Sequence, residues 1–488
     1  MDNHYNNEAD RDEETSPPVS PLSQSFNSST VSFIVYVVFE LETSITESET
    51  IEFLRTHLLP VNTRFSSIME RNDKGVLRWK RVGVRLEDHL VVPKFPKGLS
   101  RESYDEKLRE YFSKIGCENF SQEKPLWECH LVKYPSMKGA CTMIFKFSHS
   151  LGDGYSFMRV FFKVCGRADN PSLPLTFPKL SLIKTPQQAH GNRVVGLGKK
   201  LFGLVGTCIN TSYDIIETML KTTFLEDRPS AIRYSDTSAK MELFRPFSVY
   251  SVTISLERVK QVRIKLGATV NDVIIGLLSY MIHLYMERKK KLTQRYVEEG
   301  GLLMDSTDNA AADMTICVML NTRIFKGSKN LEDMIKAEAW GNHSSLVFAK
   351  LPTFPNDEQN SMIVYLLDSI LGFAIRMKGQ KGIDEMLYKS FKNATTLITN
   401  LIGPKEQMAF MNHPVGSCYY FVSGVPQSIT FTSVTTNENL MVVVTMEKGF
   451  IDSKLFTSCM DEAFENIFRA AFGDYQDKDH NEIKNKSD

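Results

Sequence analysis

The chain has 488 residues, and its 58 basic and 58 acidic side chains give a formal net charge of zero. Such a balance offers no basic surface for nucleic acid, so we expect no nucleic-acid partner. The length exceeds what one ordinary core accommodates and predicts about two domains.

The eight cysteines are scattered and form neither a CxxC pair nor a short Cys/His group. We therefore expect neither a zinc site nor a disulfide framework, and no metal or redox cofactor. The start of the chain, Met1–Glu14, is acidic and polar, which is not the pattern of a secretory signal. These features predict a reducing, cytosol-facing location.

The first elements along the chain predict a mobile tail followed by an α/β lobe. Residues 1–28 are rich in Asn, Asp, Glu, Ser and Pro and bury too little apolar area to offset the entropy of ordering, so most of them should be mobile, with order beginning at Pro17–Pro21. The apolar run Val31–Leu41 predicts a buried strand that is too short to span a bilayer as a helix. Helical spacing predicts helices over Ser48–Leu59 and Ser103–Ile115, so residues 29–168 are assigned to an N-terminal lobe.

A histidine and an aspartate stand four residues apart after the next predicted strand, Cys141–Phe147. Glycines on both sides of the aspartate allow a turn that few other residues tolerate, and Tyr155–Val164 predicts a helix directly after it. His149 therefore follows a buried strand, which is a position suited to a general base. From the residues alone, the alternative is that His149 and Asp153 cap or brace the turn.

The second half of the chain begins after a proline-rich stretch. Prolines break regular structure from Asn170 to His190, as in a linker between halves. We assign residues 169–248 to a crossover, 249–472 to a C-terminal lobe and 473–488 to a polar tail. The predicted elements of this lobe are strands over Tyr250–Leu256, Ile316–Leu320 and Leu440–Met446, a helix starting at Thr269, and a closing helix over Cys459–Phe472.

One crossover segment, Arg193–Phe224, raises the question of membrane contact. It carries an apolar stripe at helical spacing beside basic residues that could meet lipid headgroups. Lys199-Lys200 and the polar run Asn210–Asp214 argue against a spanning helix. A helix lying in the membrane interface and a helix packed on the second lobe are equally supported.

Several motifs occur in a defined order and together resemble a known family. The HxxxDG signature resembles the superfamily of acyl-CoA-dependent acyltransferases and condensation domains. The order of the other motifs is similar to that of the plant-type wax ester synthase/diacylglycerol acyltransferase family, from about Pro18 to about Ala470. These motifs are Pro125-Leu126-Trp127-Glu128, Asn271-Asp272-Val273, Asn321-Thr322-Arg323, Trp340-Gly341-Asn342 followed by Leu351-Pro352, and Thr399-Asn400-Leu401-Ile402-Gly403-Pro404.

The resemblance implies a fold and an activity. The fold would be chloramphenicol-acetyltransferase-like: two mixed α/β lobes with a tunnel that admits acyl-CoA from one face and the acceptor from the other. The activity would be CoA-dependent O-acylation of a long-chain alcohol to a wax ester, with diacylglycerol as a second acceptor and fatty acyl-CoA as co-substrate. Such apolar substrates favour attachment to a membrane surface, at the cytosolic face of the endoplasmic reticulum or alternatively at the plasma membrane.

The resemblance also implies roles for the signature residues. His149 matches the histidine that acts as base, and Asp153 matches an aspartate that braces the loop through an arginine, with direct help in catalysis as the alternative. Gly154 would serve the backbone turn. The family's usual motif has two histidines, and Ser148 stands in place of the first; its hydroxyl is either inert or bonds His149 or the acceptor.

The remaining motif residues have two interpretations each. Asn271 and Asp272 are explained by helix capping alone, and the resemblance adds a role near the tunnel. Asn321 and Arg323 would contact the CoA phosphates or the lobe interface, or form ion pairs on the surface. The motif residues Trp127 and Trp340 are expected in the core.

Two rival functions remain open. A soluble HxxxD-type acyltransferase of specialised metabolism shares the signature but normally carries a DFGWG motif near its C-terminal end. Here Gly403-Pro404 and Gly424-Val425-Pro426-Gln427 stand instead. A catalytically impaired binding protein of the same fold is suggested by Ser148 and opposed by the retention of His149 and Asp153.

Overall fold

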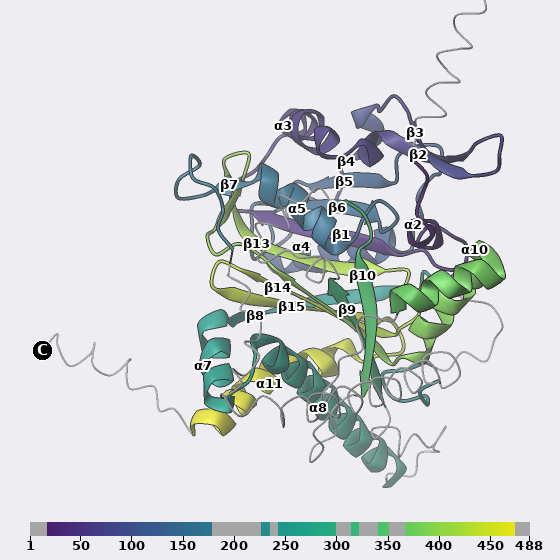
Figure 1. The fold of residues 1–488 in the computed structure, drawn as a ribbon. Coiled ribbons are helices and arrows are strands. Elements are labelled where there is room, and N and C mark those ends of the chain that lie inside the picture. Colours follow the sequence, from purple (N-terminus) through teal and green to yellow (C-terminus); the bar gives the residue numbers. More distant parts are fainter. Residues whose placement is uncertain are drawn as a thin grey trace, which may run out of the picture.

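The computed structural model describes residues 17–177, 226–234, 243–298, 314–321, 340–350 and 367–473. These residues form two large sheets and the helices that pack on them (Figure 1). The predicted membrane stripe Arg193–Phe224 and the motif residue Arg323 lie outside the described residues, as do residues 1–16 and 474–488 of the two predicted tails.

The first sheet has seven strands in the order β4-β5-β6-β1-β13-β12-β7. β1 lies at its centre, and all eight β1 residues are buried because the sheet is covered on both faces. This explains the run of Val, Ile, Phe and Tyr in β1, since such side chains fit a fully buried strand. The strands are β1 (Ile34–Leu41), β4 (Leu90–Val91), β5 (Trp127–Val132), β6 (Cys141–Ser148), β7 (Gly166–Arg167), β12 (Met408–Phe410) and β13 (His413–Ser423).

Two strands of this sheet come from the far end of the chain. β13 pairs antiparallel with β1, with Ile34 opposite Ser423, and β12 extends the sheet beyond it. The predicted lobes, residues 29–168 and 249–472, therefore do not coincide with the two sheets, because β12 and β13 of the second range complete the first sheet. The physical reason is that β1 is buried and needs a partner on each edge, and β6 occupies only one of them.

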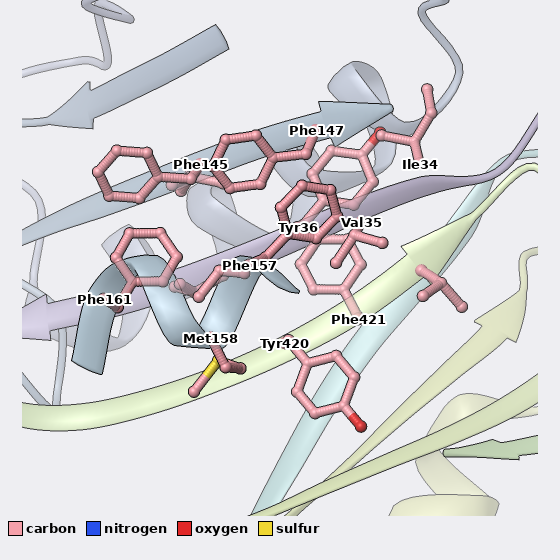
Figure 2. Packing of buried hydrophobic residues seen from close by; sticks show 14 of the residues in the cluster. Ile34, Val35, Tyr36, Phe145, Phe147, Phe157, Met158, Phe161, Tyr420 and Phe421 are labelled. Carbon is pink, nitrogen blue, oxygen red and sulfur yellow. The ribbon is translucent and has the colours of Figure 1, made fainter. Parts of the chain in front are cut away.

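The helix after the histidine is held to the first sheet by aromatic pairs (Figure 2). α5 (Gly154–Val164) confirms the helix predicted over Tyr155–Val164. Phe157 stacks on Phe147 of β6 at 4.5 Å, and Phe161 packs against Phe145 at 4.8 Å. Each such pair contributes about 0.5–1.5 kcal/mol beyond its buried area. The strand, the loop with His149 and the helix are thereby one rigid unit.

The other helices of the first lobe follow the predictions closely. α4 (Arg101–Gly116) confirms the helix predicted over Ser103–Ile115 and covers the opposite face of the sheet, where Tyr36 of β1 donates to the Ile115 carbonyl. α3 (Glu47–Phe53) begins with a capping box at Thr46 and continues into a π-helical turn, Leu54–Leu58. A small hairpin, β2 (Ser67–Arg71) and β3 (Leu77–Arg81), stands beside the sheet.

The second sheet has six strands in the order β10-β9-β11-β14-β15-β8. The predicted strands at 250–256, 316–320 and 440–446 are confirmed as β8, β9 and β15. The strands are β8 (Phe247–Ser255), β9 (Thr315–Asn321), β10 (Ser344–Lys350), β11 (Thr396–Ile402), β14 (Ile429–Thr436) and β15 (Asn439–Glu447).

Three helices build a second hydrophobic core on this sheet: α7 (Leu256–Leu266), α8 (Val270–Glu298) and α11 (Ser453–Phe472). α11 confirms the predicted closing helix. Among the described residues no single helix is long and apolar enough to cross a bilayer; α7 and α8, which meet at a 99° bend, pass such a test only as a pair and only by length and composition. A further helix, α10 (Leu367–Asn393), is kinked at Gly379.

The end of the predicted tail is folded. Residues 17–28 contain a short helix, α2 (Pro21–Ser25), with Ser20 as N-cap. Val19 and Phe26 are buried at 3 % exposure, and Ser23 and Ser25 are fully buried. The assignment of this part to the mobile tail is therefore wrong, whereas the expectation that order has begun by Pro17–Pro21 agrees with the structure. The polar composition was misleading because these serine hydroxyls bond other side chains instead of water.

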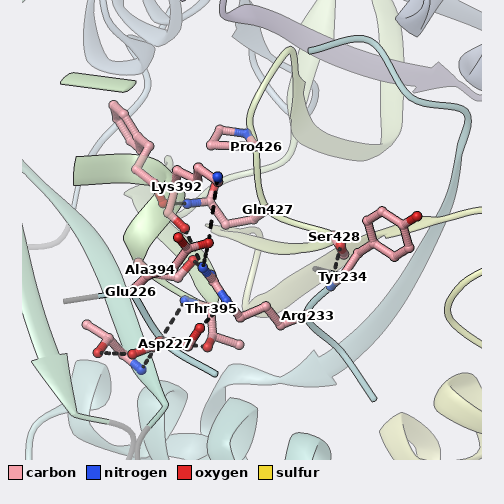
Figure 3. Close-up of polar contacts among 12 residues, drawn as sticks. Glu226, Asp227, Arg233, Tyr234, Lys392, Ala394, Thr395, Pro426, Gln427 and Ser428 are labelled. Atoms are coloured by element: carbon pink, nitrogen blue, oxygen red, sulfur yellow. Dashed lines mark hydrogen bonds and ion pairs between the residues drawn. The ribbon is translucent and has the colours of Figure 1, made fainter. Parts of the chain in front are cut away.

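A short crossover segment, residues 226–234, is fastened to the second sheet (Figure 3). The Asp227 carboxylate accepts from the main-chain N–H groups of Thr315 and Thr395, at the starts of β9 and β11, at 2.6 and 3.0 Å. Arg233 is 7 % exposed and donates to the carbonyls of Lys392 and Ala394 at 2.8 and 2.9 Å. These bonds hold the end of α10 to the sheet.

One buried carboxylate lies on the α4 side of the first sheet. Glu40 of β1 is 4 % exposed, and the Tyr419 hydroxyl donates to its Oε1 at 3.1 Å. Thr142 and Ser417 flank it in register on the neighbouring strands. Within the described residues, Glu40 Oε2 and both neighbouring hydroxyls have no hydrogen-bond partner. Burial raises the pKa of Glu40 from 4.5 to about 7, against the opposing effects of Lys138 and the Tyr419 bond.

We predict that Glu40 makes the fold less stable as the pH rises. Folded Glu40 keeps its proton to about pH 7 and unfolded Glu40 loses it near pH 4.5, so the stabilisation present at low pH disappears between these values. The slope is at most about 1.4 kcal/mol per pH unit. Chemical denaturation of Glu40→Gln should lack this slope, whereas the exposed control Glu87→Gln should keep it. Parallel pH profiles of wild type and Glu40→Gln would contradict the prediction.

Candidate active site

His149 directly follows β6 and lies in an apolar, buried setting. Its main-chain N–H donates to the Phe33 carbonyl at 2.8 Å, which continues the pairing of β6 with β1 by one residue. The residue is 3 % exposed. The ring centroids of Phe26 and Phe33 lie 4.5 and 6.4 Å from that of the imidazole. These rings keep bulk water away from the histidine.

Asn342 reaches the imidazole from the segment that leads into β10 of the second sheet. Its Oδ1 lies 2.9 Å from His149 Nδ1, and its Nδ2 donates to the His149 carbonyl at 2.9 Å and to Ser23 Oγ at 3.1 Å. A carbonyl only accepts, so the amide nitrogen must face it and Oδ1 must face the ring. Nδ1 therefore carries the proton and donates it to Oδ1, and the lone pair of the ring is on Nε2.

The surroundings also keep the imidazole neutral. Burial lowers the pKa of His149 below its ordinary value, and this effect exceeds the opposing effects of the Asp153 charge and the bond to Asn342. A neutral imidazole with a free lone pair on Nε2 can accept a proton from a hydroxyl group. The site thus has the form that a general base requires.

Asp153 occupies the N-cap of α5 and binds main chain on both sides of the site. Its Oδ1 accepts from the Ser156 N–H, and its Oδ2 accepts from the His343 N–H, both at 2.9 Å. Arg64 is the arginine whose charge interacts with it: burial lowers the pKa of Arg64 to about 10, and Asp153 opposes this shift. These contacts are those expected of an aspartate that braces the loop.

The loop between His149 and Asp153 is held through a carbonyl as well. The Leu151 carbonyl accepts from Arg64 Nη1 at 2.9 Å and from Trp340 Nε1 at 2.7 Å. Trp340, which we expected in the core, is half-buried and bonds this loop. Trp127 is fully buried as predicted and donates to the Phe65 carbonyl at 2.9 Å.

The Ser148 hydroxyl does not contact the imidazole, and the glycines have another role than expected. The Ser148 hydroxyl pairs with Ser150 Oγ at 2.7 Å rather than with His149. Gly152 and Gly154 do not have left-handed backbone angles. The expectation that they allow a turn closed to most other residues is therefore wrong. At Gly152 a Cβ would lie 2.9 Å from Ser156 Cβ, so close approach is what requires glycine. At Gly154 a Cβ would be in ordinary contact with Leu401 of β11, 3.5 Å away.

The other predicted site residues lie on the second lobe. Asp272 forms the expected capping box with Thr269 at the start of α8. Asn271 is exposed and accepts from Asn400 of β11 at 2.7 Å. The main chain of Asn321 ends β9 opposite Ser344, two residues after Asn342, so this part of the motif lies near the imidazole's partner.

The structure contains a cavity of about 770 Å³ away from the histidine. It is bounded by residues 162–166, 171–177 and the turn between β12 and β13. The cavity lies at the C-terminal end of α5, a helix of 11 residues and about 16 Å, whereas His149 precedes its N-terminal end. In the described ranges, no group of three or more His, Cys, Asp or Glu side chains is placed to hold a metal ion.

Comparison with family models decides the family. The model described as "Wax ester synthase/diacylglycerol acyltransferase catalytic domain" matches residues 97–274, which contain His149. The "WS/DGAT C-terminal domain" model matches residues 340–468, which begin with Trp340 and contain Asn342. The chain belongs to the wax ester synthase/diacylglycerol acyltransferase family. It is therefore an acyltransferase that uses acyl-CoA.

Curated relatives and solved structures agree with this assignment. Wax ester synthase/diacylglycerol acyltransferase 9 of Arabidopsis thaliana is 22 % identical over 93 % of this chain and 96 % of the relative. Wax ester synthase/diacylglycerol acyltransferase 11 of the same plant is 26 % identical over 89 % of this chain and 90 % of the relative. These identities extend over nearly the full length of both proteins.

Two kinds of solved structure share the fold of this chain. The wax ester synthase/diacylglycerol acyltransferase from Marinobacter aquaeolei VT8 superposes with a TM-score of 0.53 at 13 % identity, over 93 % of this chain and all of the other. The first condensation domain of the CDA synthetase gives a TM-score of 0.50 at 11 % identity, over 94 % and 96 %. The predicted two-lobed, chloramphenicol-acetyltransferase-like α/β fold is thereby confirmed.

Sequence reasoning missed two residues that touch the histidine of this acyltransferase. Asn342 belongs to a motif with Trp340 and Gly341, and the motif by itself assigns it no role. Phe26 lies in the segment whose polar composition predicts mobility. The role of Asn342 could have been suspected from the sequence. A polar residue that stands in a motif next to an apolar strand has few structural reasons to occupy that position.

We predict that Asn342→Asp shifts the pH dependence of acyl transfer. In the wild type, kcat/KM should fall only below pH about 6.5, because burial lowers the pKa of His149. A carboxylate facing Nδ1–H stabilises the imidazolium, raises the pKa and moves this acid limb upward by about one unit or more. The matched control is Asn439→Asp at the exposed start of β15. An acid limb that stays in place in Asn342→Asp would contradict the assigned bond.

Proposed function

We propose that this acyltransferase joins a fatty acyl group from acyl-CoA to a long-chain alcohol, giving a wax ester, with diacylglycerol as a second acceptor and His149 as the general base. The names of the Arabidopsis relatives support both acceptors. The neutral imidazole with a lone pair on Nε2 supports the chemistry. Acyl-CoA is a co-substrate, and no further cofactor enters the proposal.

In the proposed reaction, His149 Nε2 takes the hydroxyl proton as the alcohol oxygen attacks the thioester carbonyl. The tetrahedral intermediate then collapses, the C–S bond breaks, and the imidazolium returns its proton to the leaving CoA thiolate. Asn342 Oδ1 accepts from Nδ1–H throughout and thus stabilises the imidazolium that forms. Each proton removed by the histidine is returned within one turnover, so the enzyme ends in its starting state.

The observation that carries this proposal is the hydrogen bond between His149 and Asn342 across the two lobes. The histidine directly follows β6 of the first sheet, and the asparagine lies in the segment that leads into β10 of the second sheet. The proposed base and its hydrogen-bond partner therefore meet at the lobe interface. This supports a tunnel between the lobes that admits acyl-CoA and the acceptor from opposite faces, to which Asn271, Asp272, Asn321 and Arg323 would contribute.

We also propose that the protein works at a membrane surface, on the cytosolic face of the endoplasmic reticulum or at the plasma membrane. The support is the apolar stripe with flanking basic residues in Arg193–Phe224. Both proposed acceptors are dissolved in membranes, so an enzyme at the bilayer surface meets them at high local concentration.

The two rival functions are less well supported. The match to the family's catalytic-domain model disfavours a soluble acyltransferase of specialised metabolism. A binding protein that has lost turnover would not need the arrangement around His149. The replacement of the first motif histidine by Ser148 is tolerable because the Ser148 hydroxyl bonds Ser150 and leaves the imidazole contacts intact.

The test is an assay of purified full-length protein with palmitoyl-CoA and either hexadecanol or diacylglycerol. We predict ester formation by the wild type and a loss of about 10²–10⁴-fold in kcat for His149→Ala, as expected for removal of a general base. The exposed control His57→Ala should retain wild-type rates. Ester formation at a normal rate by folded His149→Ala would contradict the role of His149, and the absence of ester with every acceptor would contradict the proposed activity.

A further inference from the structure

The short helix α2 runs from the protein surface toward His149. Its N-cap Ser20 and its first residue Pro21 are exposed, whereas Ser23 and the C-cap Phe26 are buried. Phe26 contacts the imidazole with a centroid distance of 4.5 Å. Bulk water therefore stands just beyond α2.

Polar contacts fasten α2 to the other lobe. The Ser25 hydroxyl donates to Asp384 of α10 at 2.6 Å. Gln380 Nε2 donates to the Pro21 carbonyl at 3.0 Å and to Ser25 Oγ at 2.9 Å. Two side chains of α10, the buried Asp384 and the half-buried Gln380, thus hold a helix of five residues, which has too few backbone hydrogen bonds to be stable by itself.

Phe26 completes an aromatic row that continues away from the histidine. It stacks on Phe33 with centroids 5.2 Å apart, and Phe33 packs edge-on against Phe391 of α10 at 4.6 Å. Phe391 is 1 % exposed and Phe33 is 2 % exposed. The row is continuous from α10 to the imidazole and offers no polar group to a water molecule.

A histidine base in an acyltransferase faces a chemical problem that this row can solve. The lone pair on Nε2 can deprotonate water as readily as an alcohol. Water would then attack the thioester carbonyl, the C–S bond would break, and the products would be a free fatty acid and CoA thiol. Excluding water from the site is a general way to prevent such a side reaction.

We propose that α2 and Phe26 form a water-excluding wall over His149, which makes Phe26 a residue that determines specificity for an alcohol over water. This inference rests on the proposed function, because it concerns the fate of the acyl group. Phe26 supplies the apolar surface at the imidazole. Ser25, Gln380 and Asp384 keep it in place.

The test measures both products from labelled palmitoyl-CoA with hexadecanol: the wax ester and the free palmitate. In Phe26→Ala the ratio of free acid to ester should rise about tenfold, equivalent to about 1.4 kcal/mol of lost discrimination. Phe26→Leu keeps an apolar side chain at the imidazole and should restore most of the ester. The matched control is Phe464→Ala, which removes an equally buried ring, 4 % exposed, from the second core.

A second variant covers the case in which Phe26→Ala does not fold. Gln380→Ala removes the contacts of a half-buried side chain with α2 and should raise the ratio in the same direction by a smaller factor. An unchanged ratio of free acid to ester in a folded variant of either kind would contradict the proposal that α2 and Phe26 exclude water. The failure of the wild type to form any ester is a different result, which would overturn the proposed function instead.

Discussion

The hydrogen bond from His149 Nδ1 to Asn342 Oδ1 is the contact on which the site depends. It defines which ring nitrogen has the proton, and it joins the two lobes at the proposed base. The same amide donates to the His149 carbonyl and to Ser23, so its orientation is determined by two acceptors. Without this amide the buried imidazole would have no partner on Nδ1, and either tautomer could form.

The surrounding structure serves to keep these two residues in place. Aromatic pairs join β6 to α5 on both sides of the histidine loop. The segment before β10 then closes over this loop: Trp340 bonds the Leu151 carbonyl, and the His343 N–H bonds Asp153. Buried polar groups cost free energy unless they are paired, so this set of bonds is stable only when both lobes are assembled. The site and the lobe interface therefore form together.

Local pattern was sufficient to predict β1, β6, α5 and the capping box of Thr269 with Asp272, because each depends on residues within one turn or one strand. The candidate base also follows from the order strand, histidine, glycine turn and helix. The partners could not be predicted in this way: Asn342 is 193 positions from His149, and β13 pairs with a strand more than 370 positions earlier. Such contacts depend on how whole elements pack. Phe26 and the serines of α2 were missed because polar composition was interpreted as disorder, although their hydroxyls are bonded inside the protein.

The proposed chemistry requires one protonation state, a His149 that is neutral at pH 7 with its proton on Nδ1. It is tested most directly by nitrogen NMR of protein labelled with ¹⁵N at the histidine rings, with the His149 signals assigned by their loss in His149→Ala among the ten histidines of the chain. We expect a protonated Nδ1 and an unprotonated Nε2 at pH 7. A proton on Nε2, or a doubly protonated ring at that pH, would contradict it.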